Sequence, residues 1–186
     1  MRVAVITPYL PWPADTGGKL RSFYLLKGLT EVADVDLFTV CYGPTPSAGR
    51  PADLCNSVSI LAMQNRSPRR EFWEAWFNPI PKAVRHFASP ATVRAVQRRI
   101  SNGYDLLVCD EICMTPYVDF LAERGSPSDH PPRLVMRQKV DYLHYRETAE
   151  QRPMGLEKEL DRLESRRLER YERAKMPLFQ AAVVCS

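Results

Sequence analysis

The stretch from Met1 to Leu29 constrains the fold more than any other part of the sequence, because it reads as a strand, a glycine-containing loop and a helix. The apolar run Val3–Ile6 starts almost at the first residue and is rich in β-branched side chains, as expected of a strand buried on both faces. A proline-rich loop and the pair Gly17-Gly18 follow. From Leu20 to Leu29 apolar residues recur at helical spacing, which predicts a helix.

The order of strand, glycine loop and helix suits an anionic ligand. A helix N-terminus presents unpaired backbone N–H groups, and glycine lets a phosphate or sugar approach the main chain where a Cβ would block it. Two interpretations stay open for Gly17 and Gly18: their amides contact a ligand, or the glycines only shape the turn of an ordinary βα unit. We expect ligand contact, in a main-chain cradle that opens into a crevice.

Apolar runs and helical patterns alternate along the rest of the chain. The segments that read as parallel strands are Val3–Thr7, Val35–Cys41, Val58–Met63, Leu106–Cys109, Leu134–Met136 and Ala181–Cys185. The segments with helical spacing are Leu20–Leu29, Arg69–Phe77, Pro90–Ile100, Pro116–Arg124 and Leu156–Lys175. This alternation predicts an α/β fold, namely a doubly wound, mostly parallel, Rossmann-like sheet with helices on both faces.

Composition indicates an ordinary globular protein. The 186 residues fit one domain, with 45% hydrophobic and 26% charged residues, and the net charge of +4 identifies no partner class. The five cysteines form no C-x-x-C pair and read as buried or incidental thiols in a reducing cytosol, not as disulfides or zinc ligands. No signal peptide opens the sequence, and no apolar run approaches the ~20 residues of a membrane span.

The end of the chain has the pattern of a core strand. Ala181–Cys185 is apolar, and the sequence stops one residue later. A domain rarely ends at a central strand that nothing covers. We therefore expect residues 1–186 to be a single Rossmann-like domain that forms the N-terminal half of a longer protein. The C-terminal domain of that protein is expected to lie outside this sequence.

Four segments in order resemble a known family. They read ITPYLPWPADTGGKLRSFYLLKGL, SPATVRAVQRRISNGYDLLVCDE, RLVMRQKVDYLHYRE, and a charged helix leading into AAVVCS. Together they resemble the N-terminal domain of GT-B glycosyltransferases of family four, which retain the anomeric configuration. The resemblance implies two Rossmann-like domains across a cleft, a nucleotide-sugar substrate, no metal and no cofactor. It also implies a cytoplasmic enzyme of bacterial polysaccharide or glycolipid synthesis, inactive as this half alone.

The resemblance assigns donor contacts to the start of the chain. Gly17 and Gly18 match the family's glycine loop beside the donor diphosphate, and Lys19 and Arg21 follow at the helix start. A cation there opposes the helix dipole, so an anionic ligand or a carboxylate partner explains it better than helix stability does. Solvated surface remains an equal alternative for each cation.

Polar residues at two later strand ends complete the predicted site. Asp110 and Glu111 follow one strand and are candidate catalytic carboxylates that hydrogen-bond an acceptor hydroxyl or take its proton. The competing interpretation is that Asp110 caps a helix. Gln138 and Asp141 follow the next strand as candidate acceptor contacts, although relatives often carry histidine, asparagine and glutamate in this segment. His144 is expected on the surface or in the core rather than in the cleft.

A basic and aromatic segment runs from Arg66 to Arg99, where cations outnumber acids by eight to two. Trp73 and Phe77 lie within it. Such a segment suits an anionic membrane interface, where a lipid-linked acceptor is found. The alternative is that Trp73 and Phe77 pack a short helix onto the sheet. No nucleic-acid motif accompanies the charge, and the helix Leu156–Lys175 reads as a solvated amphipathic helix that covers the sheet.

Two other functions remain as alternatives. The first is a non-catalytic Rossmann-like module that binds a saccharide or tethers a complex to a membrane. The second is a dinucleotide-dependent oxidoreductase domain, which is disfavoured because no G-x-G-x-x-G follows the first strand.

Overall fold

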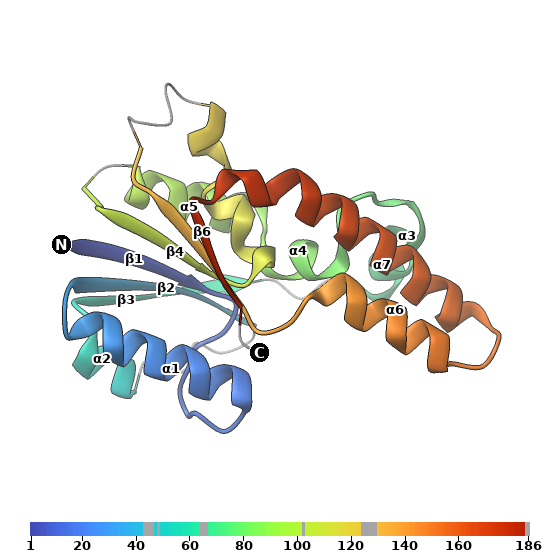
Figure 1. Ribbon diagram of the computed structural model, residues 1–186, viewed down its shortest axis with the longest axis horizontal. Coiled ribbons are helices and arrows are strands. Elements are labelled where there is room, and N and C mark those ends of the chain that lie inside the picture. The colour runs from blue at the N-terminus through green and yellow to red at the C-terminus, as the bar shows by residue number, and fades with distance from the viewer. Residues whose placement is uncertain (43–46, 48, 64–66, 102, 124–129, 185–186) are drawn as a thin grey trace.

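The computed structural model describes residues 1–186 except 43–46, 48, 64–66, 102, 124–129 and 185–186 (Figure 1). Its centre is a six-stranded sheet in the order β3-β2-β1-β4-β5-β6, and every pairing is parallel. The strands are β1 (Arg2–Thr7), β2 (Asp34–Tyr42), β3 (Ser57–Met63), β4 (Leu106–Asp110), β5 (Arg133–Arg137) and β6 (Ala181–Val184). The predicted Rossmann-like, parallel sheet is therefore confirmed.

Helices cover both faces of the sheet (Figure 1). The α-helices are α1 (Gly17–Thr30), α2 (Arg50–Leu54), α3 (Pro68–Phe77), α4 (Lys82–Phe87), α5 (Pro90–Ile100), α6 (Asp141–Gln151) and α7 (Leu156–Lys175). The described 3-10 helices are η1 (Ile112–Tyr117), η2 (Asp119–Glu123) and η4 (Met176–Leu178).

The core divides into two layers that follow the alternation of side chains along the strands. Val3 and Val5 of β1 point to one face and pack with Leu26 of α1. Ala4 and Ile6 point to the other face, where α4, α5 and η1 cover them. Burial of β1 from Val3 to Thr7 on both faces explains why the sequence shows an unbroken β-branched run there.

Four parts of the expected helical pattern differ from the structure. The segment Pro116–Arg124 does not form one α-helix, because Pro116 lies inside η1 and η2 follows it within the described residues. The short helices α2 and α4 and the helix α6 were not predicted. Ala149 is the buried residue of α6, so this helix lacks the apolar stripe by which the sequence would reveal it.

The strand β6 is an edge strand and not a core strand. All four of its residues are exposed, with Val183 at 43% and Val184 at 52%. It pairs with β5. Its apolar composition therefore does not reflect burial in this chain, and Cys185, the last residue of the predicted strand, lies outside the described residues.

Helix α7 packs against α6 as a hairpin, so it covers the sheet only toward its C-terminal end (Figure 1). There a buried ion pair of 2.7 Å joins Glu172 to Arg137 of β5. Two ion pairs at helical spacing lie on the surface of α7, Glu159 with Arg162 at 2.6 Å and Glu169 with Arg173 at 2.7 Å, whereas the pair of Glu164 with Arg167 at 3.8 Å is buried.

Two predictions, one about the cysteines and one about membrane spans, can be compared with the described part of the chain. Cys41, Cys55, Cys109 and Cys113 are free thiols there, which agrees with the prediction. Among the same residues no helix combines the length and hydropathy needed to cross a membrane.

Candidate functional site

The predicted site residues gather at the carboxyl edge of the sheet, where β1 and β4 lie side by side. From β1 the chain proceeds outward to β2 and β3, and from β4 it proceeds outward in the opposite direction to β5 and β6. The reversal makes the gap between β1 and β4 a topological switch point, the usual ligand position in an open α/β sheet. Asp110 ends β4, and the helix α1 follows the β1 loop.

Arg21 of α1 joins the two candidate carboxylates. Its Nη2 donates to Asp110 Oδ1 at 2.5 Å and to Glu111 Oε1 at 2.9 Å. The three side chains are 14%, 0% and 13% exposed, in the order Arg21, Asp110 and Glu111. Charge-assisted hydrogen bonds at this depth hold the cluster in one geometry.

Asp110 is held from both sides. Ser22 Oγ donates to Asp110 Oδ2, while Arg21 occupies Oδ1. Burial raises the pKa of Asp110, and the hydrogen bond from Ser22 and the charge of Arg21 act against that rise. The alternative interpretation of Asp110 as a helix cap is wrong, since Glu111 occupies the N-cap position of η1 and no side-chain cap bond forms there.

Glu111 has a different environment. Its φ is +93°, a left-handed backbone that side-chain-bearing residues seldom adopt and that costs about 1–3 kcal/mol. The Gln138 backbone N–H donates to Glu111 Oε1 at 3.0 Å, whereas the buried Oε2 has no hydrogen-bond partner within the described part of the chain. Burial raises the pKa of Glu111 to about 7, and the negative charge of Asp110 adds to this.

The glycine pair belongs to helix α1 and not to a loop before it. The helix begins at Gly17, with Thr16 as N-cap accepting from the Lys19 N–H at 3.4 Å. A Cβ on Gly18 would lie 2.6 Å from the Tyr9 hydroxyl and 3.2 Å from Gln138 Oε1, so polar side chains already cover this glycine. Gly17 is exposed. The nearest atom to a Cβ placed on Gly17 would be Gln138 Nε2, at 3.8 Å.

Both cations at the helix start have carboxylate partners. Lys19 Nζ lies 2.8 Å from Asp15 Oδ1 at the surface, and Arg21 is bound to Asp110 and Glu111. Of the explanations that the sequence left open, the carboxylate partner is the one seen in the structure. Contact of either cation with a donor phosphate stays a prediction.

The candidate acceptor residues flank the cluster. Gln138 is exposed beyond the end of β5, and its side chain lies beside Gly17 and Gly18. Asp141 begins α6, and burial raises its pKa, while Lys139 and Arg137 oppose the rise. His144 is exposed on α6, as the surface alternative predicted.

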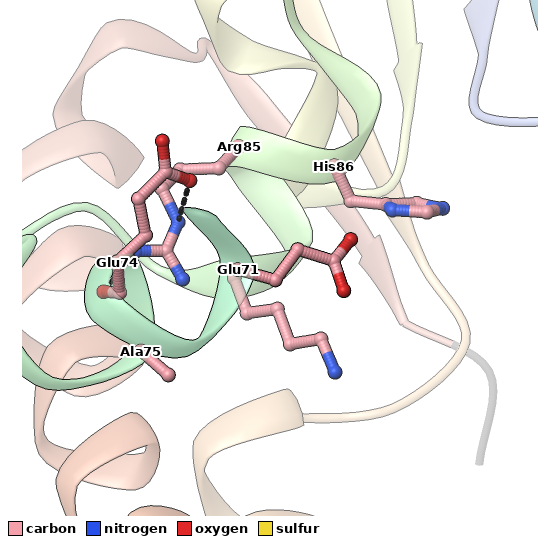
Figure 2. A pocket seen from close by; sticks show the side chains of 6 residues that line it. Glu71, Glu74, Ala75, Arg85 and His86 are labelled. Atoms are coloured by element: carbon pink, nitrogen blue, oxygen red, sulfur yellow. Dashed lines mark hydrogen bonds and ion pairs between the residues drawn. The ribbon is translucent and has the colours of Figure 1, made fainter. Parts of the chain in front are cut away.

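A cavity outside this cluster lies between α3 and α4 (Figure 2). Its lining includes Glu71 and His86, beside the ion pair of Arg85 Nε with Glu74 Oε2 at 3.8 Å. Its volume of about 70 Å³ is well below the roughly 300–1,000 Å³ of typical ligand pockets. This cavity is therefore too small for a nucleotide sugar.

Sequence reasoning missed Ser22 and Tyr9. Ser22 Oγ donates to the Gly18 carbonyl at 3.0 Å and also to Asp110, 88 positions away. A serine inside a helix gives no sign of such a distant partner. Tyr9 gave a usable signal, because it lies two residues after the end of β1 and strand ends at this edge are where ligands bind.

Comparisons with known proteins show which solved structures have a fold similar to that of this chain. No family model and no curated protein matches the sequence. Solved structures that match include three of Os79 from O. sativa: one in complex with UDP, one with UDP and deoxynivalenol-3-glucoside, and one with U2F and trichothecene. Their TM-scores are 0.52, 0.52 and 0.50, and their sequence identities are 14%, 15% and 13%.

The coverage of these matches is unequal. They cover 98–99% of this chain and 46–47% of the Os79 chain, so this chain spans about half the length of the structures it matches. The fold is thus the Rossmann-like architecture of one half of a GT-B glycosyltransferase. The likeness does not extend to family four or to a stereochemical course, which stay predictions.

Proposed function

We propose that this chain is the acceptor-side half of a glycosyltransferase that moves a sugar from a nucleotide-sugar donor to a saccharide or lipid-linked acceptor. The observation that carries the proposal is the cluster of Arg21, Asp110 and Glu111 at the switch point of this half-enzyme fold. The complex of Os79 with UDP supports a nucleoside diphosphate as the donor's leaving group.

Glu111 is the residue we assign to the acceptor hydroxyl. A carboxylate with a pKa of about 7 is partly ionised at neutral pH and so is suited to accept a proton. Its Oε2 has no hydrogen-bond partner among the described residues, which leaves it for a substrate hydroxyl. Asp110 acts through Arg21 as a positioning residue, because Ser22 and Arg21 engage both of its oxygens.

The donor and acceptor meet at the start of α1 in this proposal. Gly17 is exposed and lies at the positive end of the helix dipole, and with Lys19 it faces the diphosphate, while Gly18 contacts the donor only where the Tyr9 and Gln138 side chains that cover it move aside. Gln138 and Asp141 supply hydrogen-bonding groups for saccharide hydroxyls. We expect neither a metal nor a cofactor, because amides and cations balance the phosphate charge, and most of those cations belong to a second domain.

Retention of configuration is the expected course, and it rests on the resemblance to family four. The anomeric configuration of the product, read by proton NMR, tests it. Inversion would contradict the family while leaving glycosyl transfer itself intact. The proposed setting is bacterial polysaccharide or glycolipid synthesis on the cytoplasmic side of a membrane.

The test of the function uses the full-length protein and residues 1–186 in parallel. Each is incubated with a panel of nucleotide sugars and saccharide acceptors, and release of nucleoside diphosphate is measured. The full-length protein should turn over one donor, and Glu111→Gln should lower kcat about 100-fold, while Glu31→Gln, which changes an exposed carboxylate at the C-terminal end of α1, should not. Donor binding without transfer would favour the binding module, and absence of both would overturn the proposal.

A further inference from the structure

Helix α3 carries an aromatic face that the fold does not use. None of its residues is buried, and Phe72, Trp73 and Phe77 are 52%, 61% and 74% exposed. The rings contact one another: the centroids of Trp73 and Phe77 are 5.6 Å apart in a stacked arrangement, and those of Phe72 and Trp73 are 5.9 Å apart. The interpretation that Trp73 and Phe77 pack the helix onto the sheet is therefore wrong.

Backbone contacts fix α3 in place instead. Arg85 donates to the Glu74 carbonyl at 2.6 Å, and Arg167 of α7 donates to the carbonyls of Ala75 at 2.6 Å and Trp76 at 2.8 Å. Both arginines are 8% exposed. Cations suit the negative end of a helix dipole, so these contacts hold the C-terminal end of α3 firmly without any help from the aromatic rings.

Two exposed cations lie beside the segment that follows α3. Arg166 and Arg170 of α7 are exposed and line a groove with Pro79 and Ile80, directly after α3. Within the described part of the chain neither arginine forms an ion pair. Ile80 is itself 45% exposed and extends the apolar surface toward them.

The acids of α3 reduce this charge only in part. Glu74 lies 2.7 Å from Arg70 and is also paired with Arg85, while Glu71 is exposed. The surface formed by α3, Ile80, Arg166 and Arg170 therefore combines exposed aromatic rings with exposed cations, and Arg69 of α3 adds another cation.

We propose that this surface docks on an anionic lipid bilayer. Rings among cations match the headgroup layer, where the rings enter the acyl boundary and the guanidinium groups meet lipid phosphates. A second copy of the chain fits less well. Three rings bury at most about 750 Å², and a stable protein interface needs about 800 Å² from each partner.

The position of the surface relates it to the candidate site. Helix α3 lies beyond the carboxyl ends of the strands, next to α4 and α7 (Figure 1). The helix therefore lies toward the same edge of the sheet as Glu111, which follows the end of β4. If the proposed function holds, a lipid-linked acceptor reaches the cluster from a bilayer bound there, but the docking itself does not depend on it.

Vesicle binding tests the proposal without any activity assay. Residues 1–186 are mixed with vesicles of phosphatidylcholine alone or with phosphatidylglycerol, and binding is measured by co-sedimentation and by the tryptophan emission of the chain. We expect binding to the anionic vesicles, with a blue shift, and much weaker binding to the neutral ones. The double variant Trp73→Ser and Phe77→Ser should lower the partition coefficient about 100-fold or more.

Matched control variants distinguish vesicle binding through this surface from nonspecific binding. Val32→Ser removes an apolar side chain that is 69% exposed at the end of α1, and it should not change binding. Arg166→Gln with Arg170→Gln should weaken anionic-vesicle binding about tenfold, whereas Arg94→Gln with Arg98→Gln, on α5, should not. Circular dichroism confirms that each variant is folded.

Three outcomes would overturn the docking proposal. These are absence of binding to anionic vesicles, binding that survives the Trp73→Ser and Phe77→Ser changes, and a concentration-dependent dimer that those changes abolish. Failure of donor turnover would leave the vesicle result unaffected, so the two proposals fail separately.

Discussion

Two buried carboxylate clusters lie at opposite edges of the same sheet, and they are built in opposite ways. Asp36 of β2 lies toward the amino-terminal edge, near the start of β1 and β3. Glu111 lies at the carboxyl edge, directly after β4. The comparison separates a carboxylate that stabilises the fold from one that is suited to a ligand.

Asp36 is fully engaged. It accepts from Arg2 at 2.7 and 2.9 Å, Asn56 at 2.8 Å, Ser57 at 2.5 Å and Tyr104 at 2.8 Å. Burial alone raises the pKa of this group, but the hydrogen bonds from Ser57, Asn56, Tyr104 and Arg2 outweigh it and bring the pKa to about 2.

Within the part of the chain that the structure describes, Glu111 is engaged on one oxygen only, through Arg21 and the Gln138 backbone. Its backbone is strained at a φ of +93°, and burial raises its pKa to about 7. The two carboxylates therefore have pKa values shifted in opposite directions, and they differ in the number of donors that face them. Strain and incomplete hydrogen bonding together support the proposal that the site lies at the carboxyl edge.

The largest expected effect is on the Asp36 cluster. Asp36→Ala leaves five donor atoms without their shared acceptor, so the free energy of unfolding should fall by about 4 kcal/mol. Urea denaturation measures this. Donor binding by the folded variant should stay unchanged, and a loss of less than about 1 kcal/mol would show that the cluster is not a main support of the fold.

The next effect concerns Glu111 and depends on pH. The folded pKa of about 7 is above the unfolded value of 4.5, so its stabilising effect is complete below pH 4.5 and is lost as the pH rises through about 7. The Glu111→Gln variant does not lose stability in this way, because glutamine does not ionise. The variant should gain about 3 kcal/mol over the natural chain between these limits, as read from urea curves at several pH values. A difference that is constant with pH would contradict the shift.

The stability that Asp36 contributes should depend on pH in the opposite direction, with the loss in acid. Its folded pKa of about 2 is below the unfolded value of 3.8, so the stability it gives is present above pH 3.8 and is lost as the pH falls through about 2. The contribution is about 2 kcal/mol. Asp36→Asn should abolish this acid-dependent part of the unfolding free energy, and an unchanged profile would assign acid unfolding to other groups.

The smallest effect compares two glycines of α1. Gly18→Ala places a Cβ 2.6 Å from the Tyr9 hydroxyl and should destabilise the chain by about 1 kcal/mol. Gly28→Ala meets nothing within 4 Å and should stabilise it by about 0.5–1 kcal/mol. Thermal unfolding of both variants gives the comparison. Equal shifts of the same sign would mean that Tyr9 does not pack closely on Gly18.

Much of the fold could be predicted because strands buried on both faces leave an unbroken β-branched pattern. The run Val3–Ile6 is the strongest instance, and it is the central part of β1. Segments whose burial does not follow a simple period were lost or misassigned. Helix α6 was missed for that reason, and β6 was apolar in sequence but exposed at the sheet edge.

The site could be predicted in its position but not in its connections. Asp110 and Glu111 stood out because they follow a buried strand. Their link to Arg21 spans 89 and 90 positions, and no local pattern reports a partner so far away. The positive φ of Glu111 could not be predicted either, because glycine is the residue that indicates this conformation in a sequence.

The most direct test is the titration of Glu111 itself. Carbon NMR of the Glu111 side-chain carboxyl, assigned by comparison with Glu111→Gln, should show an inflection near pH 7, and added nucleoside diphosphate or acceptor should move it. An inflection near the ordinary value of 4.5 would show that the carboxyl edge holds an unremarkable surface acid, and the assignment of the site would fall with it.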